Sequence, residues 1–474
     1  MDEKNTPEVN EVKEVLDFEA MQEQRMAEMQ GLLEEKKMKQ LQLFLEENDE
    51  FDVAQFLTSI PKHQLAMVFR MLSKEKAAEV FAELDSPEQE YIINAITDGE
   101  LAGIIEELYL DDAVDLMEEL PANVVKRVMR MATPETRKLI NQYLKYPENS
   151  AGSIMTAEFI DLKKYMSVKE CFARIRRVGA DKETIYTCFV TDGDRKLEGI
   201  VTVKDMIMAD EGEIIADIMD DNVVFATTTD DQEDVSEIFS DYDLIAIPVV
   251  DREHRLVGIV TVDDVIDVIE QEATEDIEIM AAITPSDKPY LRQSIFSIWK
   301  SRIPWLLLLM VSATFTGLVL NKFESALAVY PILIAFIPML MDTGGNSGSQ
   351  AATTIIRGLS LGDIQFSDIA RVIWKEIRVA VSCAITIGAA SFVKILLIDR
   401  LLFGNDSISI AVAAVVCLTL IFTVIFAKFI GCIFPMLAQK IGFDPAVMAS
   451  PFITTVVDVL SLIIYFAIAS ILIL

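Results

Sequence analysis

The chain has 474 residues with 75 acidic and 41 basic side chains, a formal net charge of −34. Residues 1–300 hold 66 of the acids and 31 of the bases, whereas residues 301–474 hold 9 and 10. The acidic first part argues against nucleic acid as a partner, because its phosphates would be repelled. Hydrophobic residues make up 52% of the chain, and their concentration in the neutral second part is typical of a membrane region.

The N-terminal third is predicted to be entirely helical. Residues 1–40 are charged and form a surface helix or arm, with Met26, Met29 and Leu33 on a helical spacing. Residues 41–150 repeat short amphipathic patterns with Pro or Asp at their joints. This pattern predicts an N-domain built as a superhelix of short helices. No apolar signal segment is visible at the N-terminus, so we expect this part to stay in the cytoplasm.

An internal repeat follows the helical N-domain. The stretch from Leu197 to Asp205 (LEGIVTVKD) recurs from Leu256 to Asp264 (LVGIVTVDD), 59 residues later. Each unit is predicted to run strand, helix, strand, tight turn, strand, helix, so this region is α/β. Doubled in register, the motif resembles a CBS-domain pair, with one domain at 151–215 and the other at 216–272.

The last part of the chain is predicted to cross the membrane. A linker helix at about 264–299 leads into a membrane domain at 300–474. A span needs about 20 apolar residues, and the apolar runs give five spans at about 303–320, 326–341, 379–397, 408–437 and 445–474. Basic residues crowd the second connection, including Arg357, Arg371 and Arg378. The positive-inside rule then leaves the N-terminal part in the cytoplasm and the C-terminus outside.

Asp458 lies within the last apolar run, with Thr454 and Thr455 upstream. An ionised carboxylate is costly in hydrocarbon and persists where it faces a polar lumen or a cation. A hard dication such as Mg²⁺ prefers oxygen ligands and keeps much of its water. The alternative is a packing Asp that bonds to Ser or Thr of a neighbouring helix.

The second span contains Pro338 and a glycine cluster, which are predicted to interrupt the helix at membrane depth. Irregular backbone there is tolerated where it lines a water-filled path, so we interpret this segment as pore-lining. The alternative is a tight helix–helix contact, which glycines also permit. The candidate pore residues of this segment are Gly344, Gly345, Asn346, Gly348, Ser349 and Gln350, with Asp342 on the path or at its mouth.

An acidic run covers residues 263–276. On a helix its carboxylates form a continuous stripe whose like charges repel one another. Such a stripe is costly to compact without cations. Alone, the run is equally consistent with a solvated acidic helix face.

The segments 338–351 (PMLMDTGGNSGSQA) and 443–458 (FDPAVMASPFITTVVD) resemble the MgtE magnesium transporters, as does the order of domains. The resemblance implies a homodimer in the cell membrane that is not an enzyme, with one central pore lined by the second and fifth spans. It also implies that Asp458 binds hydrated Mg²⁺. Finally, it implies that cytosolic Mg²⁺ is sensed by Asp231, Glu233, Asp243, Asp264, Asp267, Glu272, Glu275 and Asp276, with a partner among Asp111, Asp112 and Asp115 of the N-domain.

The repeated motif also suggests a nucleotide site. In CBS pairs the Thr and Asp of this motif can contact a phosphate and a ribose, so Thr202 and Asp205 are candidates to bind ATP or another adenine nucleotide. The alternative is a structural Asp that caps the following helix.

Two other functions fit the sequence less well. A membrane-anchored signalling protein would not need Pro338, the glycines or Asp458. A transporter of anions should place basic residues in its spans, where only Lys394 and Lys428 are available, and both could snorkel or pair. The sequence contains neither a P-loop motif nor a nucleophile–base arrangement.

Overall fold

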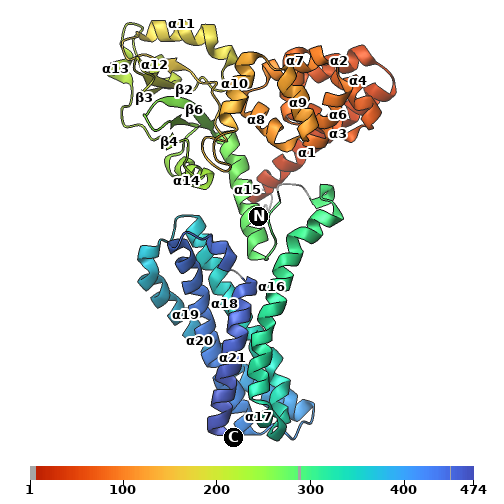
Figure 1. Cartoon of the computed structure of the whole chain (residues 1–474), viewed down its shortest axis with the longest axis vertical. Helices are drawn as coiled ribbons and strands as arrows, with labels where there is room; N and C mark the ends of the chain where they lie inside the picture. Colours follow the sequence, from red (N-terminus) through yellow and green to blue (C-terminus); the bar gives the residue numbers. More distant parts are fainter. Residues whose placement is uncertain (1–6, 287–289, 449, 474) are drawn as a thin grey trace, which may run out of the picture. The chain divides into compact units, whose positions relative to one another are not determined.

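The computed structural model describes residues 7–286, 290–448 and 450–473, and divides into two compact units, Met1–Ile266 and Asp267–Leu474 (Figure 1). The first unit holds the helical N-domain and the CBS pair. The second holds the C-terminal helices. The predicted fold class is therefore confirmed in its coarse form, and each unit is described by itself.

The N-domain is a superhelix of short helices, as predicted. Alternate helices pack together, α3 on α5, α5 on α7 and α7 on α9, so that successive helices form two layers around one apolar core. The helices are α2 (Met38–Glu47), α3 (Glu50–Ser59), α4 (Lys62–Phe69), α5 (Lys74–Ala82), α6 (Ser86–Ala95), α7 (Asp98–Glu107), α8 (Leu110–Glu119), α9 (Ala122–Met131) and α10 (Pro134–Tyr143).

The predicted N-terminal arm is a long helix, α1 (Pro7–Glu34), and its second half belongs to the core. Met29 and Leu33 are buried, and the Arg25 guanidinium pairs with the buried Asp52 carboxylate at 2.6 Å. The prediction of a surface arm is therefore wrong for this half, because its apolar side chains pack on α2 and α3. Residues 1–6 lie outside the described residues.

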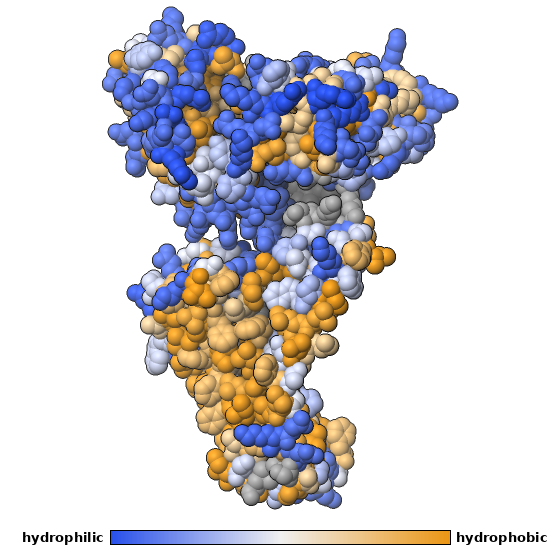
Figure 2. All heavy atoms as spheres, viewed as in Figure 1, coloured by the Kyte–Doolittle hydropathy of each residue, from blue (hydrophilic) through white to orange (hydrophobic). Residues whose placement is uncertain are grey.

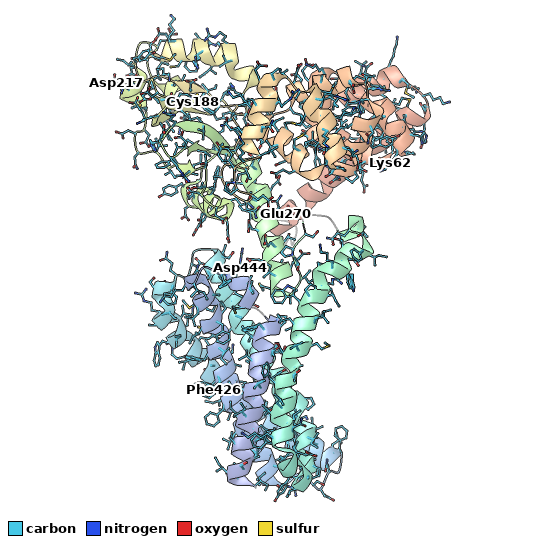
Figure 3. All side chains as sticks on the ribbon, in the orientation of Figure 1. Lys62, Cys188, Asp217, Glu270, Phe426 and Asp444 are labelled. Atoms are coloured by element: carbon cyan, nitrogen blue, oxygen red, sulfur yellow. The ribbon has the colours of Figure 1, made fainter. Side chains whose placement is uncertain are left out.

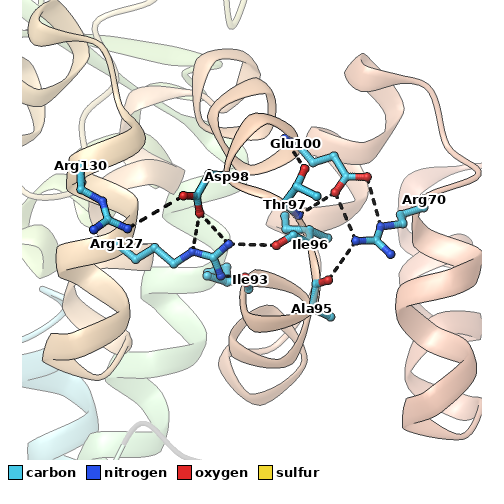
Figure 4. A network of polar contacts seen from close by, with 9 residues as sticks. All are labelled: Arg70, Ile93, Ala95, Ile96, Thr97, Asp98, Glu100, Arg127 and Arg130. Atoms are coloured by element: carbon cyan, nitrogen blue, oxygen red, sulfur yellow. Dashed lines mark hydrogen bonds and ion pairs between the residues drawn. The ribbon is translucent and has the colours of Figure 1, made fainter.

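Two arginines hold the middle of the superhelix together (Figure 4). The carbonyl groups at the end of α6 have no partners within their own helix. Arg127 of α9 donates to the carbonyl of Ile96 at 2.9 Å and to the Asp98 carboxylate at 3.0 Å. Arg70 donates to the carbonyl of Ala95 at 2.9 Å. The guanidinium groups thus satisfy the end of one helix while tying three others to it.

Each CBS domain has the predicted order of elements. In the first, β1 (Asp161–Leu162) pairs parallel with β2 (Thr187–Thr191), which pairs antiparallel with β3 (Leu197–Thr202). In the second, β4 (Ala226–Thr227), β5 (Ala246–Val250) and β6 (Leu256–Thr261) pair in the same way. The helices are α11 (Val168–Val178), α12 (Val203–Met208), α13 (Ile215–Ile218) and α14 (Gln232–Tyr242), with η1 (Gly179–Asp181) after α11.

The glycines of the repeated motif make room for a reciprocal contact. The segment that leads into each CBS domain packs against the other domain. A Cβ atom on Gly258 would lie 2.7 Å from the sulfur of Met155, which enters the first domain. A Cβ atom on Gly199 would lie 2.9 Å from the carbonyl oxygen of Asp220, which enters the second. Only glycine leaves room for these approaches. The doubled motif therefore marks a reciprocal contact between the domains.

The linker helix α15 (Val262–Met280) is shorter than the predicted range of 264–299. It ends because Ala282 adopts a left-handed conformation with φ of 55° and Pro285 follows, which disfavours helix before it. The connection to α16 contains a short 3-10 turn, η2 (Tyr290–Arg292), while residues 287–289 lie outside the described residues.

The second unit contains four helical segments long and apolar enough to span a membrane among its described residues: Ile295–Lys322, Phe366–Leu402, Ile410–Lys440 and Pro445–Leu472. None of the apolar window of the first segment is buried, and Figure 2 shows apolar surface over these helices. The individual elements are α16 (Ile295–Lys322), α17 (Glu324–Val329), η3 (Pro331–Phe336), α18 (Ile337–Ser360), η4 (Phe366–Asp368), α19 (Ile369–Lys394), η5 (Ile395–Leu402), α20 (Ile410–Lys440), η6 (Pro445–Met448) and α21 (Ser450–Leu472).

The predicted second span at 326–341 does not exist as such, because α17, η3 and the start of α18 divide it. The predicted break at Pro338 is also wrong: α18 is one helix, and its Pro lies in the first turn, where no hydrogen bond is lost.

The glycines of α18 permit close packing. A Cβ atom on Gly344 would lie 2.7 Å from Thr423 of α20, and one on Gly348 would lie 2.7 Å from Ile453 of α21. These distances favour the alternative interpretation of the glycine cluster, a tight contact between helices.

Candidate ion-binding sites

Five carboxylates of the first unit lie close enough to interact electrostatically, and we call Asp111, Asp112, Glu158, Glu183 and Asp264 the acidic cluster. Asp111 and Asp112 lie in the first turn of α8, and Asp264 lies in the first turn of α15. Helix N-termini favour negative charge, which offsets part of the repulsion. Of the three N-domain candidates, the structure therefore brings Asp111 and Asp112 to the CBS pair. Asp115 lies further along α8 and is exposed.

Three carboxylates of the cluster, those of Asp111, Asp112 and Glu183, resist ionisation. Burial, and then the Asp264 carboxylate, raises the pKa of Asp112 to about 6. Burial and Asp112 hold the pKa of Asp111 well above its ordinary value. Burial, followed by Asp263 and Asp264, raises the pKa of Glu183 to about 7. Ionising these carboxylates at neutral pH therefore costs free energy, and a bound cation would lower that cost.

Glu158 and Glu183 were not predicted. The Thr156 hydroxyl donates to the Glu158 carboxylate at 2.6 Å, and the Glu183 amide donates to the Glu158 carbonyl at 2.9 Å. These two acids lie far in sequence from Asp264, and neither belongs to the repeated motif. Only the folding of the CBS pair brings them together.

The acidic cluster is negatively charged, but its side chains are not already arranged to coordinate a metal ion. Within the part of the chain that the structure describes, no three Asp, Glu, His or Cys side chains are arranged to hold a metal ion. Mg²⁺ commonly keeps several water ligands in proteins. The cluster therefore suits a hydrated ion, or one bound after side chains rotate.

The acids predicted around α14 lie at its two ends. The Asp231 side chain caps the helix by accepting from the Glu233 amide at 3.0 Å. Asp243 follows the last turn in a left-handed conformation with φ of 50°. The 11-residue helix keeps Asp231 and Asp243 about 17 Å apart. One chain therefore does not bring these acids into a single site.

The end of the linker helix packs on the membrane helices. Burial and then the Asp444 carboxylate raise the pKa of Asp276, while a hydrogen bond with Ser360 and the charge of Arg357 lower it. Asp444 and the exposed Glu270 of α15 are labelled in Figure 3.

Apolar contacts join the same helix end to the bundle. Ile279 and Met280 pack against a buried cluster that includes Ala352 of α18, Ala446 of η6 and Ile453 of α21. The predicted linker acids Asp267, Glu272, Glu275 and Asp276 therefore lie on a helix whose end touches α18 and α21 directly.

Asp458 lies on α21 at its contact with α18 and α20. Its Oδ1 atom is buried without a hydrogen-bond partner, as is Oγ1 of Thr423 on α20. Asp342 of α18 is close enough to interact with it electrostatically. Thr454 faces α18, since a Cβ atom on Gly345 would lie 2.9 Å from its methyl group. A buried carboxylate oxygen without a hydrogen-bond partner at a contact between helices indicates that it needs a further polar partner.

The exposed face of α18 is polar along its whole length. Its buried face carries small and aliphatic residues. Within a membrane, a helix of this kind would need water or another protein surface against its polar face. Beyond Pro338, the exposed residues of α18 are Asp342, Asn346, Gln350, Thr353, Thr354 and Arg357.

The two internal lysines are paired, as the sequence allowed. Lys428 of α20 lies 3.2 Å from Glu376 of α19, with both side chains largely buried. Lys394 lies 2.8 Å from Asp399. Neither lysine therefore offers an unpaired positive charge for an anion path.

Thr202 and Asp205 form a capping box at the start of α12. The Asp205 amide donates to the Thr202 hydroxyl at 3.1 Å, and the Thr202 amide donates to the Asp205 carboxylate at 3.1 Å. In the second domain the Thr261 hydroxyl donates to Asp264 at 2.7 Å. The capping interpretation is thus confirmed for Asp205, while its contact with a nucleotide stays a prediction.

The three regions match three family models. Residues 48–149 match the MgtE intracellular N domain, residues 151–212 and 215–271 match the CBS domain, and residues 337–468 match a divalent cation transporter. Together with the apolar helices, these matches define a membrane transporter of divalent cations with an intracellular helical domain and a CBS pair.

Comparison with similar proteins identifies the family within this class. The chain is 37% identical to the magnesium transporter MgtE of Thermus thermophilus, over 77% of this chain and 79% of the relative. It is 33% identical to that of Bacillus subtilis, over 76% and 78%. The chain belongs to the MgtE family of magnesium transporters, which are not enzymes.

One solved structure with a TM-score above 0.5 agrees with this assignment. A crystal structure of the soluble part of a magnesium transporter is 30% identical, with a TM-score of 0.51, and covers 53% of this chain and 99% of that one. A cytosolic domain of the Mg²⁺ channel MgtE in complex with ATP is 37% identical, with a TM-score of 0.49, and covers 51% and 99%.

Proposed function

We propose that this protein takes up Mg²⁺ through a channel-like pore shared by two copies of the chain. The observation that carries this proposal is the polar face of α18. Lipid cannot satisfy Asp342, Asn346 and Gln350, whereas a water-filled path between two copies can. In this proposal α18 is the fifth span, beside the four apolar ones, and the C-terminus lies outside the cell.

Asp458 is the proposed ion-contacting residue of the pore. Its unpartnered oxygen suits a hydrated dication, and Thr454 and Thr455 supply hydroxyl groups one turn away. Gly344, Gly345 and Gly348 hold α18 against α20 and α21, and so fix the position of the polar face that lines the path. An inside-negative potential drives the ion inward at about 2.3 kcal/mol per charge per 100 mV.

Gating is proposed to follow cytosolic Mg²⁺. At low concentration the acidic cluster repels itself and the cytosolic domains separate, whereas at high concentration Mg²⁺ bridges the carboxylates. The compact state then moves α15, whose end packs on α18 and α21, to close the pore. Asp231, Glu233 and Asp243 lie apart within one chain, so their role in this proposal requires acids of the second copy.

A nucleotide site at Thr202 and Asp205 remains part of the proposal. The capping box leaves Asp205 exposed at the end of β3, where a ribose could replace part of its hydrogen bonding. The expected effect of ATP is a change in the Mg²⁺ concentration that closes the pore.

The function is tested by ion flux into liposomes that hold a Mg²⁺-sensitive dye. Wild-type protein should admit Mg²⁺, and Co²⁺ and Ca²⁺ added in competition should rank the ions. Flux that persists undiminished in Asp458→Ala would overturn the assignment of the pore.

A further inference from the structure

A cavity of about 310 Å³ opens on the first CBS domain, away from Thr202 and Asp205. It lies between α11, the start of β1, the tip of the β2–β3 hairpin and the first residue of β6. The side chains of Arg174, Lys182, Arg195 and Thr191 line its polar side, and Phe159 and Leu256 are part of its apolar side.

The charge of this cavity is opposite to that of the part of the chain around it. Among its lining residues Asp161 is the single acid, and it is already neutralised: Arg174 binds its carboxylate, and the Lys163 ammonium lies 3.5 Å from it. Lys182 and Arg195 add further positive charge. A local excess of cations within an acidic domain favours an anionic ligand.

The second CBS domain shows that the fold does not demand this polarity. Helix caps Ser167 and Asp231 align the two domains with an offset of 64 residues, which places Phe225 opposite Asp161. The hairpin offset of 59 residues places His254 opposite Arg195. In the second domain the Phe225 and His254 rings stack edge to face at 4.8 Å.

The two hairpin tips also share a backbone conformation. Arg195 and His254 are both left-handed, with φ of 66° and 62°. Glycine would adopt this conformation at less cost. Arg195 is therefore a costly residue at this turn; its side chain lines the cavity, and its guanidinium donates to the carbonyl of Leu256 at 3.3 Å.

We propose that this cavity, which we call the CBS1 cation pocket, binds a small phosphate-bearing anion. Guanidinium groups of arginine match the geometry of phosphate oxygens, and a lysine adds a point charge. Thr191 supplies a hydroxyl, and the volume suits a phosphate or pyrophosphate group with a small apolar substituent.

The pocket shares its wall with the acidic cluster. Glu158 lies between two lining residues, Ala157 and Phe159, and Glu183 directly follows Lys182. The Glu183 amide also bonds to the Glu158 carbonyl. Anion binding therefore acts on the segments that carry two of the cluster carboxylates. The inference that anion binding changes the response to Mg²⁺ rests on the proposed function, whereas the inference that the pocket binds an anion does not.

The pocket is tested by calorimetric titration of inorganic phosphate and of pyrophosphate into the full-length protein in detergent, without Mg²⁺ and at fixed ionic strength. Lys182→Gln and Arg195→Gly should each weaken binding about tenfold, as expected for one lost charge-assisted hydrogen bond. The glycine variant relieves the backbone, so it should stay folded. Arg177→Gln is the matched control, since it removes an exposed cation from α11 outside the pocket.

Two results would overturn the proposal: binding that neither pocket variant weakens, or binding that Arg177→Gln weakens equally, which indicates attraction without a site. A second titration, of Mg²⁺ against protease resistance with and without phosphate, measures the coupling. If phosphate binds but leaves the midpoint of the Mg²⁺ titration unchanged, the result supports the anion site and contradicts its coupling to the acidic cluster.

Discussion

The carboxylate of Asp112, at the start of α8, and that of Asp264, at the start of α15, lie close enough to repel each other, so the N-domain and the CBS pair repel where they meet. Thr261 orients Asp264 through a hydrogen bond of 2.7 Å. Burial of Asp112 limits the screening of this repulsion by water. The contact is therefore sensitive to anything that neutralises it, whether a proton or a metal ion.

Acid should stabilise the first unit in the absence of Mg²⁺. The pKa of Asp112 is raised to about 6 and that of Glu183 to about 7. A carboxyl with a raised pKa binds its proton more tightly when folded, so stability falls as the pH rises from about 4 to 7. We expect the melting temperature to be a few degrees higher at pH 5 than at pH 8, measured by calorimetry in detergent.

Mg²⁺ should replace the proton. At pH 8 saturating Mg²⁺ should restore most of the lost stability, and the double variant Asp112→Asn, Glu183→Gln should flatten the pH dependence. A pH response as large in this double variant as in the wild type would mean that other groups titrate.

Removing the carboxylates proposed to sense Mg²⁺ should weaken inhibition by Mg²⁺. The double variant Asp264→Ala, Asp267→Ala removes ligands through which Mg²⁺ would stabilise the compact state. Its pore should therefore remain open at Mg²⁺ concentrations that close the wild type. Patch-clamp recording with varied cytosolic Mg²⁺ measures this, and an increase of about tenfold in the inhibitory concentration is expected from about 1.4 kcal/mol of lost binding. Asp217→Ala is the control, because Asp217 is an exposed acid on α13 (Figure 3). Inhibition at the wild-type concentration would contradict the sensor role.

Neutralising Asp458 should abolish flux and spare the cytosolic response. Asp458→Asn keeps the shape of the side chain but removes its charge, so the pore loses its attraction for a dication. Liposome flux should fall at least tenfold, while protease protection of the first unit by Mg²⁺ stays as in the wild type. Asp406→Asn is the matched control, since Asp406 lies exposed in the connection before α20. Equal loss in both variants would point to a general effect of surface charge.

Periodicity and repeats were enough to predict most of the architecture. The 59-residue offset placed both CBS domains, and the amphipathic patterns predicted the superhelix. The break at Pro338 was wrong because a proline in the first turn of a helix costs nothing there, and the extent of the apolar run did not reveal where that helix begins.

The candidate sites were predictable only where a motif carries them. Asp264 closes a repeated motif and Asp458 interrupts an apolar run, so both are visible in the sequence. Glu158 and Glu183 carry no such signal, because their proximity to Asp112 comes from three separate chain segments meeting. The CBS1 cation pocket was missed for the same reason, since Asp161, Arg174 and Arg195 are distant in sequence.

The glycine contact between α18 and α20 should tolerate little added volume. A Cβ atom on Gly431 of α20 would overlap the carbonyl oxygen of Gly348 on α18, and backbone cannot move aside as a side chain can. Gly431→Ala should therefore force the helices apart and cost about 1–3 kcal/mol, the usual range for overpacking. Gly317→Ala on α16 meets nothing within 4 Å and should leave stability unchanged or slightly increased. Thermal unfolding of both variants in detergent separates the two cases, and equal melting temperatures would show that α18 and α20 do not pack through these glycines.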